Sequence, residues 1–382
     1  MTGMSFPADL HAPVPLSDLL ERIRRNASLF DQQFPTVGEG TRYKLGANDN
    51  WLAGFWTGLL WLAYAATGDD DLKHHAQTLL PTFAARLDQR IHITHDLGFL
   101  FTLSARAQWQ LMGDTPARDL ALRAAADLAQ RFIPQGGYIQ AWGALDGSAE
   151  HSRAIIDTMM NVPLLFWAAH QTGDDHYHTI ARQHVETTAR TLVRPDGAAY
   201  HTYFFDPHSG EPLRPSTHQG YADDSLWARG QAWTIYGFAV AAAWCDDPTF
   251  LDVSRHAAER FLDELPPGGV PWWDLRLPAG APHHRDSSAG AIAATGILRL
   301  AAQVGGDTGA ALRDRGVALL QHLIDACLET LPDAQGLLRG GTYHAHKGWG
   351  VDEYFICGDY FFLEALLMLA GSLPDFWEPL RH

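Results

Sequence analysis

The sequence predicts an all-α protein with an (α/α)6 barrel, in which six helical hairpins form an inner and an outer ring of helices. Two repeated observations predict this fold. Apolar segments end in a small residue and an aspartate, after which an amphipathic segment begins. A cluster of polar and aromatic residues also lies about one helix length before each of these ends. Inner helices that all begin at one end of a barrel would bring these clusters together at its mouth.

The junctions between helices are the clearest repeat. A glycine near a helix C-terminus followed by an aspartate as the next N-cap joins two antiparallel helices tightly. The repeat length of 45 to 73 residues leaves room for an additional loop in each hairpin. We therefore predict a hairpin around each of five aspartates: Asp69, Asp114, Asp174, Asp247 and Asp307.

The segments on the two sides of a junction differ in their patterning. Segments such as 98–113 and 161–173 are apolar on nearly all sides, as expected for a helix packed on both faces. Segments such as 119–133 and 180–193 have apolar residues at three- and four-residue spacing, with charges between them. We assign the first kind to the inner ring and the second kind to the half-exposed outer ring.

The polar clusters share a register. Asp96 lies 18 residues before Asp114, and Asp157 lies 17 residues before Asp174, which places both at the same end of parallel inner helices. The clusters, in chain order, are Asp49, Asn50 and Trp51; His95 and Asp96; Asp157 and Asn161; Asp224, Trp227 and Arg229; Arg285, Asp286 and Ser287; and Asp352, Glu353 and Asp359.

The remaining segments are long insertions, among which 200–213 is the best candidate for a β-hairpin. No Pro- or Ser-rich linker divides the chain. We therefore expect one domain over residues 1–382, with residues 1–15 as a loose N-terminal extension.

Composition excludes several classes of function. The net charge of −16 disfavours nucleic acid and anionic membrane as partners, and no run of about 18 apolar residues predicts a membrane span. Three cysteines without paired spacing argue against a disulfide framework or zinc site, and no signal-peptide pattern is seen, so we expect a cytoplasmic protein. Nucleotide-binding and serine-hydrolase motifs are absent from the sequence, and we expect no cofactor and no metal. The thirteen tryptophans favour carbohydrate as a ligand.

The stretch 218–238 concentrates polar and aromatic side chains ahead of an apolar segment. Residues 223–225 are candidates to cap the N-terminus of that helix. Trp227 and Trp233 would then offer stacking surfaces in the first turns, and Arg229 a fork for a carboxylate. A capped core helix would also explain the tryptophans, but it explains the arginine less well.

Asp96 and Asp157 are the most informative carboxylates because both are flanked by apolar residues. Such an aspartate is either a helix cap or a group whose raised pKa lets it deliver a proton. Capping is the commoner role for either one alone. Their matched register favours two carboxylates across one cavity, which act as a general acid/base pair or in which one keeps the other protonated.

Three further residues have two interpretations each. Trp142 lies in a glycine-rich loop and is either a stacking surface or a loop anchor. His201 flanks an insertion, where histidines more often have structural roles. Lys347 could meet a substrate anion or be a solvated loop lysine.

Three stretches resemble the unsaturated glucuronyl hydrolases, a family of glycoside hydrolases built as an (α/α)6 barrel: HDLGFLF, IIDTMMNVPLLFWAA and QGYADDSLWARGQAWTIYGFA. The resemblance extends from Trp51 to the last helix. It implies that Asp157 is the general acid/base and that Asp96 is a second essential aspartate. It also implies substrate contacts at Trp142, His201, Gln219, Trp227, Arg229 and Trp233, to which we add Trp51 and Lys347.

The resemblance also implies the chemistry. The substrates are oligosaccharides that a polysaccharide lyase has left with a C4=C5 double bond in the glucuronic acid at the non-reducing end. Asp157 would protonate C4 and then activate water to attack C5, after which the hemiketal rearranges and releases the sugar. Asp96 would hold Asp157 protonated or bind a ring hydroxyl. The uronic acid would stack on tryptophan, with its carboxylate near Arg229. The oligomeric state stays open.

One stretch departs from the family, and three other functions compete. Members that act on sulfated glycosaminoglycan fragments carry Ser-x-x-Ser-x-Lys, whereas residues 342–347 keep the lysine and lack both serines. This favours unsulfated substrates. An unsaturated rhamnogalacturonyl hydrolase would share the barrel and chemistry, although SLWARGQAW suits the glucuronyl family better. A sugar 2-epimerase would use histidines on inner helices, and a non-catalytic glycan-binding protein would lack Asp96 or Asp157.

Overall fold

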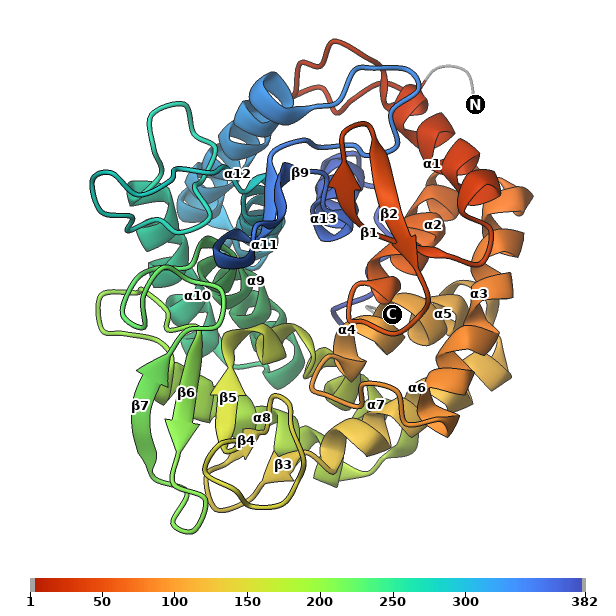
Figure 1. The fold of residues 1–382 in the computed structure, drawn as a ribbon. Coiled ribbons are helices and arrows are strands. Elements are labelled where there is room, and N and C mark those ends of the chain that lie inside the picture. Colours follow the sequence, from red (N-terminus) through yellow and green to blue (C-terminus); the bar gives the residue numbers. More distant parts are fainter. Residues whose placement is uncertain (1–3, 380–382) are drawn as a thin grey trace.

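The computed structural model describes residues 4–379, and its helices form two concentric rings (Figure 1). Six outer helices are seen among the described residues: α1 (Leu16–Phe30), α3 (Asp70–Asp88), α6 (Thr115–Ala129), α8 (Asp175–Thr191), α10 (Pro248–Asp263) and α12 (Gly306–Cys327). The inner positions are α2 (Ala53–Thr67), the continuous segment α4–η1–α5 (Leu97–Phe101, Thr102–Arg106 and Ala107–Met112), α7 (Pro163–Thr172), α9 (Ala228–Cys245), α11 (Ser287–Val304) and α13 (Ile356–Leu369). The predicted (α/α)6 barrel is confirmed.

The two rings differ in burial as their patterning predicts. Every residue of α9 from Ala228 to Ala242 is buried, because this inner helix packs on all sides. The outer helix α8 buries one face only, which includes Ile180, His184 and Val185. In this part of the barrel, apolar side chains all round mark the inner helix and a single apolar stripe marks the outer one.

The junctions follow the predicted design in four of the five cases. The side chains of four aspartates cap the following outer helix by accepting a backbone N–H: Asp69, Asp114, Asp174 and Asp247. Gly68, Gly113 and Gly173 end the preceding helices with a positive φ, which favours glycine. At Asp307 the predicted hairpin is present, because α11 and α12 pack against each other, but the predicted cap is wrong. Gly305 is the N-cap of α12, and Asp307 lies inside its first turn.

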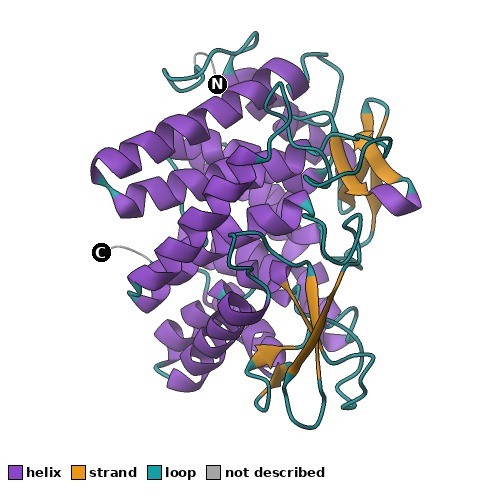
Figure 2. Cartoon of the chain, turned by 90° about the vertical axis from the view of Figure 1, so that its left-hand side faces the viewer, coloured by secondary structure: helices purple, strands orange, loops and turns teal. Residues whose placement is uncertain are grey.

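Short β-sheets lie at one end of the barrel, and their strands lead into inner helices (Figure 2). We call this end the mouth. The predicted hairpin at 200–213 is confirmed, because β6 pairs with β7 in antiparallel register. The strands are β1 (Phe34–Glu39), β2 (Arg42–Gly46), β3 (Phe132–Ile133), β4 (Tyr138–Ile139), β5 (Arg153–Ile155), β6 (Thr202–Phe205), β7 (Pro212–Ser216), β8 (Gly341–His344) and β9 (Trp349–Glu353).

The ring closes between its first and last inner helices. The last inner helix, α13, packs against both α11 and α2. Tyr43 donates its hydroxyl hydrogen to Asp359 Oδ2 at 2.7 Å, and Arg22 Nη1 donates to the carbonyl of Gly336 at 2.7 Å. These bonds join residues more than 300 positions apart in the chain. We call this contact the seam.

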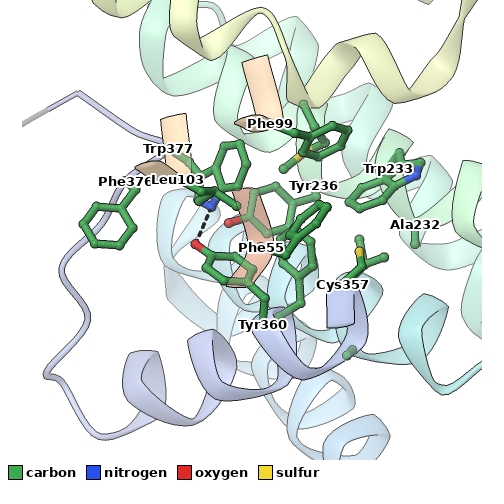
Figure 3. Close-up of a cluster of buried hydrophobic side chains, with 14 of the residues drawn as sticks. Phe55, Phe99, Leu103, Ala232, Trp233, Tyr236, Cys357, Tyr360, Phe376 and Trp377 are labelled. Carbon is green, nitrogen blue, oxygen red and sulfur yellow. Dashed lines mark hydrogen bonds between the residues drawn. The ribbon is translucent and has the colours of Figure 1, made fainter. Parts of the chain in front are cut away.

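The described terminal segments are both docked. The prediction of a loose extension is wrong for residues 4–15, because Leu10 is buried and His11 exchanges two hydrogen bonds with Gln321 of α12. Residues 1–3 lie outside the described residues. The C-terminal segment lies at the end of the barrel opposite the strands (Figure 2). There, Trp377 joins the aromatic cluster inside the barrel and donates to the Tyr360 hydroxyl at 3.2 Å (Figure 3). Among the described residues, no helix combines the length and apolarity that a membrane crossing requires.

Candidate active site

The two predicted aspartates lie where inner helical segments begin. Asp96 is the N-cap residue of α4, yet its carboxylate accepts from the Thr94 hydroxyl at 3.0 Å and caps nothing. Asp157 lies in the 3-10 helix η2 (Ile156–Met160), just before α7, and it does not act as a side-chain cap either. The capping interpretation is therefore excluded for both.

The segments that carry Asp96 and Asp157 approach each other closely at Gly98. A Cβ atom there would lie 2.2 Å from Asn161 Cα, so only glycine allows this spacing. Asn161 then connects the segments, since its Oδ1 accepts from Phe99 N at 2.7 Å and its Nδ2 donates to Asp157 O at 3.2 Å. The separation of the two aspartates is thus set by buried hydrogen bonds.

His95 continues this connection toward Asp96. Its Nδ1 accepts from the Thr158 hydroxyl at 2.9 Å and faces Asn161 Nδ2 at 3.2 Å. A neutral ring that accepts at Nδ1 carries its proton on Nε2, which lies 3.4 Å from Asp96 Oδ1. Burial lowers the pKa of His95 and keeps it neutral. We call His95, Thr158 and Asn161 the clamp.

Asp157 has the properties of an acid that is protonated near neutral pH. Its residue surface is 7% exposed, and Oδ1 is buried without a hydrogen-bond partner among the described residues. Burial, and then the charge of Asp96, raise the pKa of Asp157 to about 7, while the charge of Arg229 opposes the shift. A buried carboxyl group with an unused oxygen is suited to exchange a proton with a ligand.

His201 is a neutral donor beside Asp157. Its Nδ1 accepts the backbone N–H groups of His218 at 3.1 Å and Gln219 at 3.3 Å, which leaves the ring proton on Nε2. Nε2 lies 4.0 Å from Asp157 Oδ1 and has no hydrogen-bond partner among the described residues. Burial holds the pKa of His201 well below its usual value, and its ring stacks on Trp227 with centroids 4.0 Å apart.

Two predicted contact residues meet at Tyr343. Trp51 Nε1 donates to the Tyr343 hydroxyl at 3.3 Å, and Gln219 Nε2 donates to the Tyr343 carbonyl at 2.8 Å. Trp51, Tyr343 and Asp96 line a polar cavity of about 370 Å³, which also includes Arg86. Tyr343 was missed in the sequence because it belongs to no periodic segment, whereas His95 stood in a predicted cluster beside Asp96.

Trp142 is half-buried and stands over two histidines. Its ring centroid lies 6.3 Å from that of His95 and 5.6 Å from that of His218. Gln140 Nε2 donates to the Trp142 carbonyl at 3.0 Å, and Arg131 Nε donates to the Gln140 carbonyl at 2.9 Å. The loop is thus held from behind, so Trp142 presents a positioned aromatic face near Asp96.

Arg229 is buried in a hydrogen-bond network beside the site. Its side chain is 1% exposed, and Nη1 donates to Asp286 Oδ2 at 2.7 Å and to the carbonyl of Thr342. Nη2 donates to the Tyr343 carbonyl at 2.7 Å. Nη1 and one N–H group of Nη2 are thus bonded inside the protein, whereas Nε is buried without a hydrogen-bond partner among the described residues. A direct contact with a substrate carboxylate stays a prediction. Arg229 also positions the strand that carries Tyr343.

The predicted cap at residues 223–225 is also wrong. Helix α9 begins after Trp227 without a side-chain cap. Asp223 Oδ1 accepts from Thr217 N at 2.8 Å, and Ser225 donates to Asp274 Oδ2 at 2.6 Å. These groups organise the loop before α9 and do not contact the helix terminus.

The last two predicted residues lie at different depths. Trp233 is fully buried against Phe99, with ring centroids 5.2 Å apart, and its Nε1 forms no full hydrogen bond with the described residues. Its indole N–H lowers the pKa of Asp157, so it lies next to that carboxyl group. Lys347 is exposed and lies 4.5 Å above the Trp349 ring. Burial, and then the charge of Lys347, lower the pKa of His218. Within the described chain, no group of three or more potential ligands is arranged to hold a metal ion.

Comparison with known proteins identifies the family of this chain. The chain matches Glycosyl Hydrolase Family 88 over residues 26–263. It belongs to this family. Over 376 residues it is 40% identical to the unsaturated glucuronyl hydrolase of Bacillus sp. (strain GL1), covering 95% of this chain and 97% of the relative. Over 363 residues it is 40% identical to the unsaturated chondroitin disaccharide hydrolase of Streptococcus pyogenes serotype M1, covering 94% and 91%.

Solved structures of family 88 relatives show the same architecture. The unsaturated glucuronyl hydrolase of Bacillus sp. GL1 superimposes with a TM-score of 0.92 at 41% identity, covering 95% of this chain and 98% of that one. A mutant of the Streptococcus agalactiae unsaturated glucuronyl hydrolase, complexed with dGlcA-GalNAc6S, has a TM-score of 0.83 at 35% identity, covering 95% and 92%. This family 88 chain is therefore a glycoside hydrolase with an α/α barrel fold.

Proposed function

We propose that this hydrolase removes the 4,5-unsaturated glucuronic acid from the non-reducing end of lyase-generated oligosaccharides, and that residues 1–382 act as one catalytic domain. The observation that carries the proposal is the state of Asp157, a buried acid with a pKa raised to about 7 and a free Oδ1. Vinyl ether hydration needs such a proton donor and needs no cofactor. The names of full-length relatives support the same reaction.

In the proposed reaction, Asp157 transfers its proton to C4, and the C4=C5 π electrons form the new C–H bond. The positive charge that develops is shared by C5 and the ring oxygen. Water adds to C5 and returns a proton to Asp157, so one water is consumed. The C5 hemiketal then opens, and the C1 hemiacetal collapses to an aldehyde, which releases the leaving sugar as an alcohol.

The surrounding groups support these steps. Asp96 accepts from the Thr94 hydroxyl at 3.0 Å and lies 3.4 Å from His95 Nε2. Burial, and then the charge of Asp96, raise the pKa of Asp157 and so keep it protonated. The same charge stabilises the cationic centre. His201 Nε2–H and Trp233 Nε1–H are unused donors next to Asp157, suited to the hydroxyl and carboxylate groups of a uronic acid.

The site favours unsulfated leaving sugars. Thr342, at the position of the first family serine, is buried and donates to the Arg285 carbonyl at 2.6 Å. Ala345, at the second, has no hydrogen-bonding side chain. Lys347 alone remains as an exposed cation. We also propose a cytoplasmic enzyme, because its three cysteines are free thiols.

The test is the ultraviolet absorbance of the conjugated C4=C5 bond. Purified protein is mixed with unsaturated disaccharides prepared by lyases from chondroitin, hyaluronan, heparin and rhamnogalacturonan. We expect absorbance to fall with glucuronyl substrates, and faster with unsulfated than with 6-sulfated chondroitin disaccharide. Loss with the rhamnogalacturonan product alone would favour the rhamnogalacturonyl alternative. No loss with any substrate, from folded protein, would reject the hydrolase, and saturated sugars would then be tested for isomerisation.

A further inference from the structure

The sheet formed by β5, β6 and β7 lies next to two groups of the candidate site (Figure 1). Strand β5 leads directly into η2, the short helix that carries Asp157. His201 immediately precedes β6, and its carbonyl accepts from Ile156 N at 2.9 Å. The backbone beside the acid and beside its neighbouring donor is therefore fixed by this sheet. The proposed reaction uses no side chain of the three strands themselves.

Side chains from all three strands form one row on this sheet. The strand register pairs Arg153 of β5 with Phe204 of β6, and Phe204 with Arg214 of β7. Residues directly opposite each other on neighbouring strands point to the same face of a sheet. Arg153 Cζ and Arg214 Cζ each lie 4.5 Å from the centroid of the Phe204 ring. The Phe204 ring thus makes a cation–π contact with a guanidinium group from each neighbouring strand.

The row continues from Arg153 to the predicted stacking surface. Arg153 Cζ also lies over the Trp142 ring, 5.2 Å from its centroid. The guanidinium group donates to the Glu150 carbonyl, and within the described chain it forms no ion pair with a carboxylate. A planar guanidinium group stacks on aromatic faces in a way that an ammonium group cannot. The two rings and this one carbonyl therefore set the orientation of Arg153.

The loop that carries Trp142 is fixed through its backbone. Ala141 N donates to the Arg153 carbonyl at 3.0 Å, and Arg131 Nη2 donates to the Gly143 carbonyl at 3.2 Å. The indole N–H of Trp142 makes no hydrogen bond with the described residues, and the side chain is half-buried. Backbone bonds alone leave an indole several rotamers. The contact with Arg153 ties the ring itself to the sheet.

We propose that Arg153 is a positioning residue for substrate binding, which holds the Trp142 indole in the orientation on which a sugar ring of the substrate stacks. This inference rests on the proposed function and deepens it. Strand β5 carries Arg153 at its start and continues into the segment of Asp157, so one strand places both the stacking surface and the acid. Without the guanidinium group the indole has more rotamers to lose on binding, and substrate affinity falls. Asp157 stays in place, so the chemical step is unchanged.

The first test measures KM and kcat of Arg153→Met on unsaturated hyaluronan disaccharide, by loss of absorbance. We expect KM to rise about fivefold, because one cation–π contact is lost, and kcat to stay within about twofold. Arg153→Lys keeps the charge and should raise KM only about twofold. Arg190→Met, which removes an exposed arginine of the outer helix α8, should change neither constant. An unchanged KM in Arg153→Met would overturn the positioning role.

A double-mutant cycle tests whether Arg153 acts through Trp142. Trp142→Ala alone should raise KM about tenfold. Adding Arg153→Met should then change KM less than about twofold, because the ring that Arg153 positions is already absent. A further fivefold rise would show that Arg153 acts on the substrate or the fold directly and would reject the inference.

Two other outcomes are also decisive. If Arg153→Met does not fold, the cycle is run with Arg153→Lys, whose effect on KM should disappear in the Trp142→Ala protein and would contradict the inference if it persisted. Unaltered protein that turns over no disaccharide would reject the proposed function itself. That result is distinct from active unaltered protein in which the losses from the two substitutions add, which rejects the role of Arg153 alone.

Discussion

The two ends of the barrel each bury a carboxyl group with a raised pKa, yet they differ in what surrounds it. Burial raises the pKa of Asp157 at the mouth and of Glu364 at the opposite end to about 7 in both cases. Glu364 receives the Tyr236 hydroxyl at 3.0 Å and Arg299 Nη2 at 2.9 Å. Asp157 Oδ1 accepts no hydrogen bond from the described residues. A raised pKa therefore does not by itself distinguish a structural carboxyl group such as Glu364 from the candidate catalytic Asp157. The oxygen without a hydrogen-bond partner does.

At the opposite end, buried ion pairs hold the C-terminal segment against the barrel. Arg299, with a side chain that is 1% exposed, also pairs with Asp375 at 2.5 Å and Glu378 at 3.2 Å, which ties the C-terminal segment to α11. A cavity of about 400 Å³ is bordered by these three residues. The charged side chains of these three residues are already paired with one another, so cavity size alone does not locate the reaction.

Replacing one carboxyl group at each end tests this comparison most strongly. Asp157→Asn should lower kcat at least about a thousandfold, because the amide keeps the shape but cannot donate the proton. Glu364→Gln should stay within about threefold of the unaltered enzyme, because Glu364 is bonded to Tyr236 and Arg299 at the opposite end of the barrel. Absorbance assays on both variants measure this difference. Similar losses from the two substitutions would show that the ends are not functionally distinct.

Arg299→Met should lower the stability of the protein and leave its activity unchanged, in contrast to Asp157→Asn. It leaves buried carboxylates without their cation, and we expect the free energy of unfolding to fall by about 3–5 kcal/mol. Urea unfolding followed by circular dichroism measures the change. Arg118→Ala, which removes an exposed ion pair with Asp119, should cost less than about 0.5 kcal/mol. If Arg299→Met unfolds no more easily than Arg118→Ala, the network is not structural. Folded Arg299→Met protein should keep its kcat.

Asp157 should affect the pH dependence of two quantities, kcat/KM and the free energy of unfolding. Its acid form is required, so kcat/KM should fall as pH rises through about 7. Its folded pKa is above the ordinary value, so its contribution to stability is complete below about pH 4 and is lost as pH rises through about 7. Asp157→Asn should therefore gain about 2 kcal/mol over the unaltered protein between pH 5 and pH 9, measured by unfolding at each pH. A constant difference would contradict the raised pKa.

The smallest predicted effect concerns the clamp. Asn161→Ala removes the bonds to Phe99 and to the Asp157 carbonyl, and we expect kcat to fall about tenfold. A looser clamp weakens the effect of the Asp96 charge on Asp157, so the alkaline limb of the pH profile should move to lower pH. Thr172→Val, at the other end of α7, is the control. An unchanged alkaline limb would mean that Asn161 supports the fold alone.

The sequence correctly predicted the features that depend only on residues close together in the chain. A helix cap needs only the aspartate and the first N–H groups that follow it, so Asp69 and Asp174 were identified correctly. The meeting of Asp96 and Asp157 was predicted because equal register in successive hairpins places both at one end. Equal register does not predict the distance between the two aspartates, because that distance depends on the close approach at Gly98.

The features that the sequence did not predict depend on distant partners. The hydrogen bonds of Arg229 are one example, because Asp286 and Tyr343, which accept from its terminal nitrogens, lie 57 and 114 residues away. Glycine near a junction is also ambiguous, because Gly305 starts α12 before the aspartate that was expected to cap it. No local pattern in 4–15 showed that these residues would pack against α12.

The seam has a consequence for how the protein folds. A ring made from one chain closes only when Tyr43 finds Asp359 and Arg22 finds Gly336, and each search spans a loop of more than 300 residues. Loop closure of this length is entropically costly, and contacts between distant residues slow folding. Until then the arc of hairpins has two open apolar edges, one on α2 and one on α13. We expect closure to be the late, slow step of refolding, with self-association of the open arc as its main competitor.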